Sequence, residues 1–328
     1  MINSDDRTYS ENIIICIPVY NDWDAVGVLI ERFDYELSKF NGKVSILIVD
    51  DGSTENPPDK LSTTPANIDK IEIIRLRRNL GHQRAIAVGL SYIYVQNYEK
   101  QAVLIMDGDG EDDPKDIQAL LDCCRKWEFR KIIFAKRSKR SEGKLFKFGY
   151  LNYKVVHYLL TGIKVEVGNF SIIPYQMLNR LMGVSELWNH YAAAVFHARL
   201  PLELIPLSRG KRIAGKSRMN FISLVVHGMS AISVFGETVA VRLLCFVGLL
   251  MALTLTGLAA TVFVKFFTDL AIPGWATNLT GILSIVLLNL LILATFSALL
   301  MLNSRDRQSF LPLRDWQYFV EDKRTIHG

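Results

Sequence analysis

The chain has 328 residues, enough for one large domain or two small ones with an ample core. Half of its residues are hydrophobic and its mean hydropathy is +0.18, which excludes an ordinary soluble enzyme. The formal net charge of +5 is modest, so charge gives no reason to expect a nucleic-acid partner. The four cysteines lack C-x-x-C spacing, and we expect reduced packing residues rather than a disulfide or zinc framework.

The first part of the chain alternates predicted strands with predicted helices. Runs of apolar residues predict strands at 13–18, 44–49, 71–76, 103–106 and 132–135. Apolar residues at helical spacing predict helices at 23–40, 79–96 and 114–128. Repeated βα units of this length predict an α/β fold, with a mainly parallel sheet and helices on both faces.

Two further helices are predicted before the most apolar part of the chain. The helix at 145–160 is rich in aromatic residues, and a core helix, a tetramer contact and a membrane-surface helix all remain open. The helix at 221–235 is mildly amphipathic, and we expect it at a membrane interface, with a simple linker helix as the alternative. We expect the protein to form a homo-oligomer.

The surplus of apolar residues lies in two uncharged stretches, 243–264 and 279–302. Each is long enough to cross the membrane, since a helix needs roughly 20 residues to span about 30 Å of hydrocarbon. Basic residues gather before the first stretch and after the second, whereas the connector 265–278 carries one Lys and one Asp. The positive-inside rule therefore predicts an integral, multi-pass membrane protein whose main domain and both termini are cytoplasmic.

Polar residues follow three predicted strands at the points where the strands end. They are Pro18 to Asn21 after the first strand, Asp50 to Ser53 after the second, and an acidic run from Asp107 after the fourth. The carboxyl ends of parallel strands meet at one edge of a sheet, where open α/β sheets bind their ligands. The three strand ends together therefore predict a ligand site at this edge.

The acidic run reads DGDGEDDP from Asp107. Asp107 and Asp109 are spaced so that both carboxylates can face one hard divalent ion. Taken alone, the run also fits a solvated turn, with Asp112 or Asp113 as the cap of the next helix.

Between the second and fourth strands, residues 77–85 read RRNLGHQRA and form a turn that opens a helix. Backbone amides at a helix start suit an anionic ligand, and Asn79 and Gly81 are the candidate residues there. The alternative is that Asn79 caps the helix and that the neighbouring arginines are solvated.

The ordered set of motifs resembles glycosyltransferase family 2, and more narrowly its branch of dolichol-phosphate mannose synthases and bacterial polyprenyl-phosphate glycosyltransferases. The motifs are PVYND, VDDGS, RRNLGHQRA, MDGDGEDDP, GNF at 168–170 and RGKRIAGKSRM at 209–219. The resemblance implies a GT-A type nucleotide-sugar-binding domain followed by a two-helix membrane anchor. It divides the chain into a cytoplasmic GT-A domain (1–217), a juxtamembrane interface helix (218–242), two transmembrane helices (243–302) and a cytoplasmic basic tail (303–328).

The resemblance, with the strand-end and helix-start residues above, gives a set of candidate site residues. Asp107 and Asp109 match the motif that binds Mg²⁺ or Mn²⁺ and, through the metal, the donor diphosphate. Candidates for binding the nucleotide sugar and the phosphates are Pro18, Tyr20, Asn21, Asp50, Asp51, Gly52, Ser53, Asn79, Gly81, Asp107, Arg137, Arg209, Lys216 and Ser217. Candidate catalytic residues are Asp109, Asp112, Asn169 and Arg212.

Asn169 departs from the pattern of these relatives, which commonly have Asp there as a proposed base. An amide cannot take up a proton at neutral pH, whereas a phosphomonoester is already mostly deprotonated. The substitution therefore fits a phosphate nucleophile better than a sugar hydroxyl, unless Asp112 or Asp113 serves as the base.

The expected activity is inverting transfer of a sugar from a UDP- or GDP-linked donor to a polyprenyl phosphate, undecaprenyl or dolichyl, at the cytoplasmic face of the membrane. Its product would serve in the assembly of a cell-envelope glycan. Two alternatives remain. One is a family 2 transferase that uses a glycolipid hydroxyl, and the other is a non-catalytic, nucleotide-sugar-binding membrane scaffold.

Overall fold

The computed structural model describes residues 12–57, 64–96, 102–137, 144–164, 166–208, 210, 212–213, 221–269, 272–305 and 310–328. The chain forms two compact units. We call the first the sheet unit, which comprises Met1–Tyr150, Val165–Val234 and Ser309–Gly328. We call the second the hairpin unit, which comprises Leu151–Lys164 and Phe235–Gln308.

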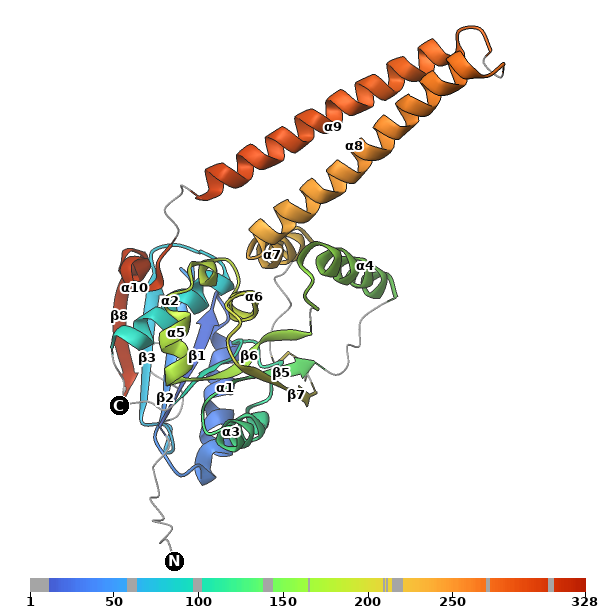
Figure 1. The fold of residues 1–328 in the computed structure, drawn as a ribbon. Coiled ribbons are helices and arrows are strands. Elements are labelled where there is room, and N and C mark those ends of the chain that lie inside the picture. The colour runs from blue at the N-terminus through green and yellow to red at the C-terminus, as the bar shows by residue number, and fades with distance from the viewer. Residues whose placement is uncertain are drawn as a thin grey trace, which may run out of the picture. The chain divides into compact units, whose positions relative to one another are not determined.

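An eight-stranded sheet forms the centre of the sheet unit, in the order β7-β5-β6-β4-β1-β2-β3-β8 (Figure 1). The strands are β1 (Ile13–Val19), β2 (Val44–Asp50), β3 (Lys70–Leu76), β4 (Ala102–Ile105), β5 (Ile132–Arg137), β6 (Val167–Pro174), β7 (Leu202–Leu207) and β8 (Val320–His327). Strand β1 runs parallel to β2 and β4, β2 runs parallel to β3, and β5 runs parallel to β7. Strands β6 and β8 run antiparallel to their neighbours. The predicted α/β class with a mainly parallel sheet is confirmed.

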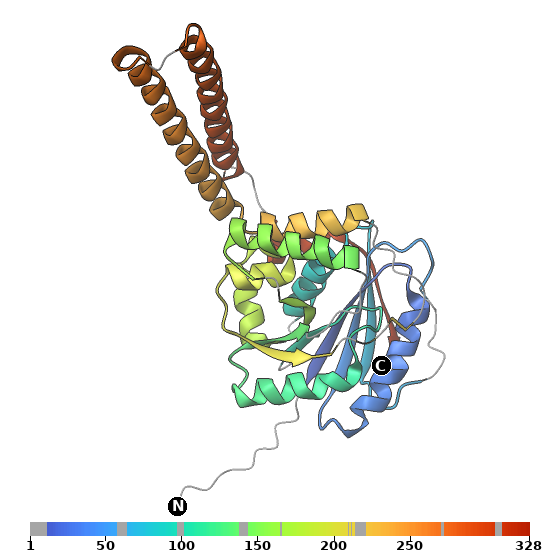
Figure 2. The ribbon, with the colours of Figure 1, turned by 90° about the vertical axis from the view of Figure 1, so that its right-hand side faces the viewer.

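Helices cover both faces of the sheet (Figure 1 and Figure 2). Helices α1 (Trp23–Glu36) and α3 (Ile117–Lys126) share one hydrophobic core, and α2 (His82–Val95), α5 (Tyr175–Leu181) and α6 (Tyr191–His197) share the other. Strand β1 supplies both cores, because alternate side chains of a strand point to opposite faces. Ile15 and Ile17 belong to the α1 side, whereas Ile14 and Cys16 belong to the α2 side. A strand buried on both faces is continuously apolar, which is why β1 is easy to recognise in the sequence.

The described residues also form further helical elements. They are η1 (Leu37–Lys39), η2 (Pro114–Asp116), α4 (Lys144–Thr161), η3 (Ser185–Trp188), α7 (Phe221–Ser233), α10 (Pro312–Asp315) and η4 (Trp316–Phe319). The helix predicted at 114–128 is divided into η2 and α3, and the one predicted at 79–96 begins three residues later, at His82.

The end of the chain differs from the expected basic tail at 303–328. Residues 310–328 fold with the sheet unit, and β8 pairs antiparallel with β3, with Ile73 opposite Arg324. Trp316 is buried and meets the ring of Tyr92 edge-on, with 5.6 Å between the ring centroids. The segment therefore completes one edge of the sheet.

The hairpin unit contains α8 (Gly236–Phe267) and α9 (Trp275–Arg305), which are both long and apolar enough to cross a membrane. The buried residues of α8 recur at every seventh position, Val247, Thr254 and Thr261, and so form one stripe along the helix. Gly257 adjoins this stripe, and a Cβ there would lie 3.5 Å from Leu283 of α9. Small residues at such a contact let two apolar helices pack closely.

Arg242, near the start of α8, caps the last turn of α4. Its guanidinium donates hydrogen bonds to the carbonyl oxygens of Tyr158 (3.4 Å) and Leu159 (2.8 Å). A cation at the carboxyl end of a helix offsets the partial negative charge of the unpaired carbonyl groups there.

Candidate active site

The ends of β1, β2 and β4 meet at one edge of the sheet, as the sequence predicts. The backbone N–H of Asp51 donates to the carbonyl oxygen of Val19 over 2.8 Å, which joins the first two strand ends. A Cβ at Gly108 would lie 3.3 Å from the carbonyl oxygen of Pro18, so the loop after β4 runs against the end of β1.

Asn21 ties the loop after β1 to the loop after β2. Its backbone N–H donates to Ser53 Oγ (2.8 Å), and its side-chain oxygen accepts from the amides of Thr54 (2.8 Å) and Glu55 (3.0 Å). Asn21 adopts φ 51°, a left-handed conformation that asparagine tolerates better than most residues. Its neighbour Tyr20 is exposed and can contact a ligand.

Asp50 is fully buried, and its side chain stabilises the loop after β2 by binding a backbone amide of that loop. Its Oδ1 accepts from the backbone N–H of Ser53 (2.8 Å), and its Oδ2 lies 3.7 Å from Arg75 Nε. Gly52 is required at the turn because its φ is 67° and a Cβ would lie 2.5 Å from the carbonyl carbon of Arg78. The loop after β2 therefore packs directly on the turn before α2.

Asp51 holds that turn. Its two carboxylate oxygens accept from the backbone N–H groups of Leu80 (2.7 Å) and Gly81 (2.8 Å). Burial raises the pKa of Asp51 to about 6, while the two amide hydrogen bonds oppose the shift. Asn79 is exposed and Gly81 occupies the cap position of α2, so the alternative in which Asn79 caps the helix is wrong. Two amides of the predicted anion site are already bound to Asp51.

The acidic pair lies at the end of β4, and both carboxylates are partly exposed. Asp107 Oδ1 accepts from Asn169 Nδ2 (3.0 Å), and Asp109 Oδ1 accepts from the backbone N–H of Glu111 (3.0 Å). Arg212 bridges the pair to α1, because its guanidinium contacts Asp22 and lies 3.6 Å from Asp109 Oδ2. Asp22 therefore binds Arg212 and makes no side-chain cap on α1.

The donor set fits a divalent cation that also binds substrate phosphates. The part of the chain that the structure describes has no group of three His, Cys, Asp or Glu side chains able to enclose a metal ion. Mg²⁺ needs no such cage, since it is commonly held by one or two carboxylates together with phosphates and water.

The described residues of the basic loop, Gly210, Arg212 and Ile213, pack on the acidic run. The backbone N–H of Gly210 donates to Glu111 O (2.7 Å), and that of Ile213 donates to Asp109 O (3.1 Å). Ile213 covers Gly110 so closely that a Cβ there would lie 2.1 Å from its Cδ1. Arg209, Lys216 and Ser217 lie outside the described residues, and Arg137 is the last residue of β5.

Asp112 and Asp113 differ in their surroundings. Asp112 is 6% exposed, whereas Asp113 caps η2 by accepting from the backbone N–H of Lys115 (3.2 Å), with Pro114 in the first turn. The helix-cap interpretation therefore holds for Asp113.

Three histidines from separate segments form a group, the histidine cluster, and one of them, His82, lies near Asp107. The ring of His227, on α7, lies 5.0 Å from that of His82 and 4.8 Å from that of His190, between centroids. Burial lowers the pKa of His82, and the nearby Asp107 carboxylate opposes that shift. No local sequence pattern signals this cluster, because its members are far apart in the chain.

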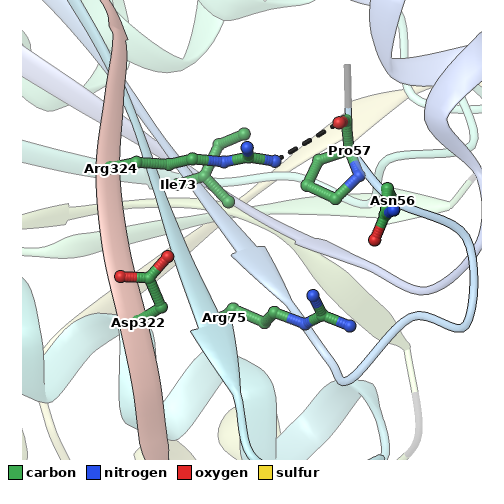
Figure 3. A pocket seen from close by; sticks show the side chains of 6 residues that line it. All are labelled: Asn56, Pro57, Ile73, Arg75, Asp322 and Arg324. Carbon is green, nitrogen blue, oxygen red and sulfur yellow. Dashed lines mark hydrogen bonds between the residues drawn. The ribbon is translucent and has the colours of Figure 1, made fainter. Parts of the chain in front are cut away.

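A cavity of about 320 Å³ lies between the loop after β2 and the β3–β8 edge (Figure 3). It is lined by Asn56, Pro57, Ile73, Arg75, Asp322 and Arg324. Arg324 donates to Pro57 O (3.3 Å), and Arg75 donates to Ser53 O (3.1 Å), so both arginines brace the loop that Asp50 holds from inside.

The protein family of the chain is identified by comparison with known proteins. The model of glycosyl transferase family 2 matches residues 14–181, and the chain belongs to this family. Glucosyl-3-phosphoglycerate synthase of Mycobacterium tuberculosis, solved with Mn²⁺, UDP-glucose and phosphoglyceric acid, has the same fold. Its TM-score is 0.50 at 13% identity, over 70% of this chain and 80% of that one. The predicted GT-A fold is confirmed.

Three curated relatives show which glycosyltransferases the chain resembles in sequence. The uncharacterized glycosyltransferase YkcC of Bacillus subtilis (strain 168) is 24% identical over 94% of this chain and 95% of its own length. The dodecaprenyl-phosphate galacturonate synthase of Rhizobium johnstonii is 26% identical over 43% of this chain and 40% of its own. The undecaprenyl-phosphate 4-deoxy-4-formamido-L-arabinose transferase of Pectobacterium atrosepticum is 31% identical over 34% of this chain and 33% of its own. The chain is thus a family 2 glycosyltransferase, and two of its partial relatives are named for polyprenyl phosphates.

Proposed function

We propose that the protein is a membrane-anchored, inverting glycosyltransferase that moves a sugar from a UDP- or GDP-linked donor to a polyprenyl phosphate. The observation that carries the proposal is the partly exposed pair Asp107 and Asp109 at the meeting strand ends of a GT-A fold. Two helices long and apolar enough to cross a membrane support a lipid substrate. The names of the partial relatives support a polyprenyl phosphate in particular.

Asp107 and Asp109 would hold Mg²⁺ or Mn²⁺. When bound, the metal would offset the negative charge that develops on the departing nucleoside diphosphate. Arg212 lies 3.6 Å from Asp109 and would add a fixed positive charge beside the same phosphates. Tyr20 and the backbone of the Asp50 to Ser53 loop would contact the nucleotide.

Asn169 and His82 support a phosphate as the acceptor. Asn169 cannot take up a proton, and a phosphate acceptor needs none removed at neutral pH. His82 lies near Asp107, and its ring would donate a hydrogen bond to the acceptor phosphate. Asp112 remains the proposed base for the alternative reaction with a glycolipid hydroxyl.

The proposal includes the predicted topology. α8 and α9 would cross the membrane, with the sheet unit and both termini in the cytoplasm, residues 218–242 at the interface, and copies of the chain associated as a homo-oligomer. The basic residues that flank the two apolar stretches support this orientation.

The test is an assay of the purified full-length protein with radiolabelled UDP- and GDP-sugars, undecaprenyl phosphate and Mn²⁺ or Mg²⁺. We expect a lipid-extractable, acid-labile labelled product. Asp109→Asn should abolish the product and leave membrane insertion intact, because it removes one charge from the metal site. Donor hydrolysis without a labelled lipid, or full activity of Asp109→Asn, would refute the acceptor and the metal assignment respectively.

A further inference from the structure

We propose that Gln83 and Asn169 are positioning residues, which together fix the orientation of the Asp107 carboxylate through a buried chain of hydrogen bonds. The inference rests on the proposed role of Asp107 in metal binding. It assigns Asn169 a role other than that of a base, and it adds Gln83, which the sequence motifs do not single out.

The chain of hydrogen bonds runs from α6 to the acidic pair. The backbone N–H of Tyr191 donates to Gln83 Oε1 (2.7 Å), Gln83 Nε2 donates to Asn169 Oδ1 (2.9 Å), and Asn169 Nδ2 donates to Asp107 Oδ1 (3.0 Å). These contacts join positions up to 108 residues apart in the sequence.

The donor-to-acceptor direction of this series of hydrogen bonds is fixed at both ends. A backbone N–H can only donate, and an ionised carboxylate can only accept. Each of the two amides between them therefore has a single orientation that satisfies its neighbours, which removes the usual ambiguity between amide oxygen and nitrogen. Asn169 must present its NH₂ group to Asp107.

A second path holds Asn169 from its backbone side. Ser171 Oγ donates to Asn169 O (2.8 Å) and lies 2.8 Å from the hydroxyl of Tyr191. Since the serine proton is used for Asn169, the Tyr191 hydroxyl is the donor in that pair. Burial raises the pKa of Tyr191, so it keeps this proton.

The network is shielded from water. Ser171 and Tyr191 are 0% exposed, and Gln83 and Asn169 are each 6% exposed. Hydrogen bonds in such surroundings are stronger than in water, and an unsatisfied partner is costly. The network therefore has one stable arrangement, in which Asp107 Oδ1 is held and the carboxylate cannot rotate freely.

This arrangement explains why position 169 carries Asn, where the relatives commonly have Asp. An aspartate there would still accept from Gln83, but its second oxygen would face Asp107 with no proton between them. Two adjacent carboxylates repel each other unless they share a proton or a cation. In this chain an amide is required at position 169 so that Asp107 has a donor.

The test uses Mn²⁺ binding by the purified full-length protein, measured by electron paramagnetic resonance with UDP and with GDP. Gln83→Glu keeps the acceptor for the Tyr191 N–H, but it turns the Asn169 amide over and sets oxygen against oxygen at Asp107. We expect this variant to fold and to bind Mn²⁺ roughly 10- to 100-fold more weakly, the usual cost of losing a group that orients a metal ligand. Gln83→Leu removes the hydrogen bond to Asn169 without reversing its amide, so its loss of Mn²⁺ affinity should be smaller.

The matched control is Gln118→Leu, which removes an exposed helix glutamine bonded to Asp122. Its Mn²⁺ affinity should equal that of the wild type. An unchanged Mn²⁺ affinity in Gln83→Glu would overturn the inference.

A thermal double-variant cycle separates this inference from the proposed function. Gln83→Leu and Asp107→Ala disrupt one network, so their losses in melting temperature should not add, and additive losses would overturn the inference. Equal Mn²⁺ binding by the wild type and Asp107→Ala would instead refute the metal assignment. The double-variant cycle would still show whether Gln83 and Asp107 belong to one hydrogen-bond network.

Discussion

Individual residues at the strand ends divide into those that hold the loops and those that can meet a ligand. Asp50, Asp51 and Asn21 use their side chains to bind neighbouring backbone amides. Tyr20 and the pair Asp107 and Asp109 are at least partly exposed. Carboxylates that look alike in the sequence therefore have different roles: the buried ones hold loops, and the partly exposed ones can bind a ligand.

Arg212 is expected to compete with a metal ion for Asp109. Removing its positive charge by Arg212→Ala should raise the affinity for Mn²⁺ alone by about tenfold, which corresponds to about 1.4 kcal/mol, and should lower the rate of sugar transfer. Isothermal titration with MnCl₂ measures the first effect. Arg130→Ala, at a salt bridge with Glu128 on the surface, is the control and should change neither. Weaker Mn²⁺ binding by Arg212→Ala would contradict this account.

Asp51 should make stability depend on pH. Its folded-state pKa of about 6 lies above the ordinary 3.8, so its contribution to stability is fully present below pH 3.8 and is lost as pH rises through 6. The full loss is about 3 kcal/mol, at about 1.4 kcal/mol for each unit of pKa. Thermal melts from pH 4 to 8 should show the wild type losing stability relative to Asp51→Asn. A constant difference between the two proteins would count against the buried, partly protonated carboxyl.

At the scale of elements, the C-terminal strand supports the loop after β2, which we propose contacts the nucleotide. Strand β8 pairs with β3, and its Arg324 reaches the loop after β2 at Pro57 (Figure 3). Arg75 of β3 lies 3.8 Å from Glu321 of β8 and donates to Ser53 O. A segment that follows the apolar helices in sequence thus braces a loop near the start of the chain.

Trp316 is expected to anchor this strand. Trp316→Ala should destabilise the sheet unit by about 3 kcal/mol, in the usual range for removing a buried aromatic side chain. Hydrogen exchange should then increase in β8 and in the paired residues of β3. Tyr318→Ala, which removes an exposed ring two residues away, should leave both strands protected. Unchanged protection in Trp316→Ala would show that β8 needs no such anchor.

The elements that the sequence predicts well are those whose pattern is set locally. β1, β2 and β4 are continuous apolar runs because helices cover both of their faces. β8 reads VEDKRTIH, and a strand at an exposed edge carries charges that conceal it from a search for apolar runs. The Gln83 to Asp107 network and the histidine cluster depend on contacts between distant segments, which no local pattern contains.

At the scale of the whole molecule, one chain combines a GT-A sheet unit with a pair of long apolar helices. Side chains such as Leu253 and Phe263 are exposed on α8, where a soluble protein would carry polar residues. Arg242 and the stripe through Thr254 give the hairpin unit its own internal contacts. Such an arrangement suits an enzyme whose donor is dissolved in water and whose acceptor is a lipid.

The proposed orientation predicts which residues can be labelled from outside the cell. A membrane-impermeant maleimide should label Asp269→Cys, in the connector between α8 and α9, in intact cells. It should label Tyr318→Cys, on the exposed surface of the sheet unit, only after the cells are permeabilised. Labelling of Tyr318→Cys in intact cells would reverse the proposed orientation, and the unmodified protein serves as the background control.

The most direct measurement of the central claim compares two lipids that differ only in the phosphate. The full-length protein would receive a labelled nucleotide sugar and Mn²⁺ with either undecaprenyl phosphate or undecaprenol. If the acceptor is a phosphate that needs no base at position 169, label will enter only undecaprenyl phosphate, and Asp107→Ala will prevent it. Equal labelling of undecaprenol, or transfer to another glycolipid while undecaprenyl phosphate stays unlabelled, would contradict the account.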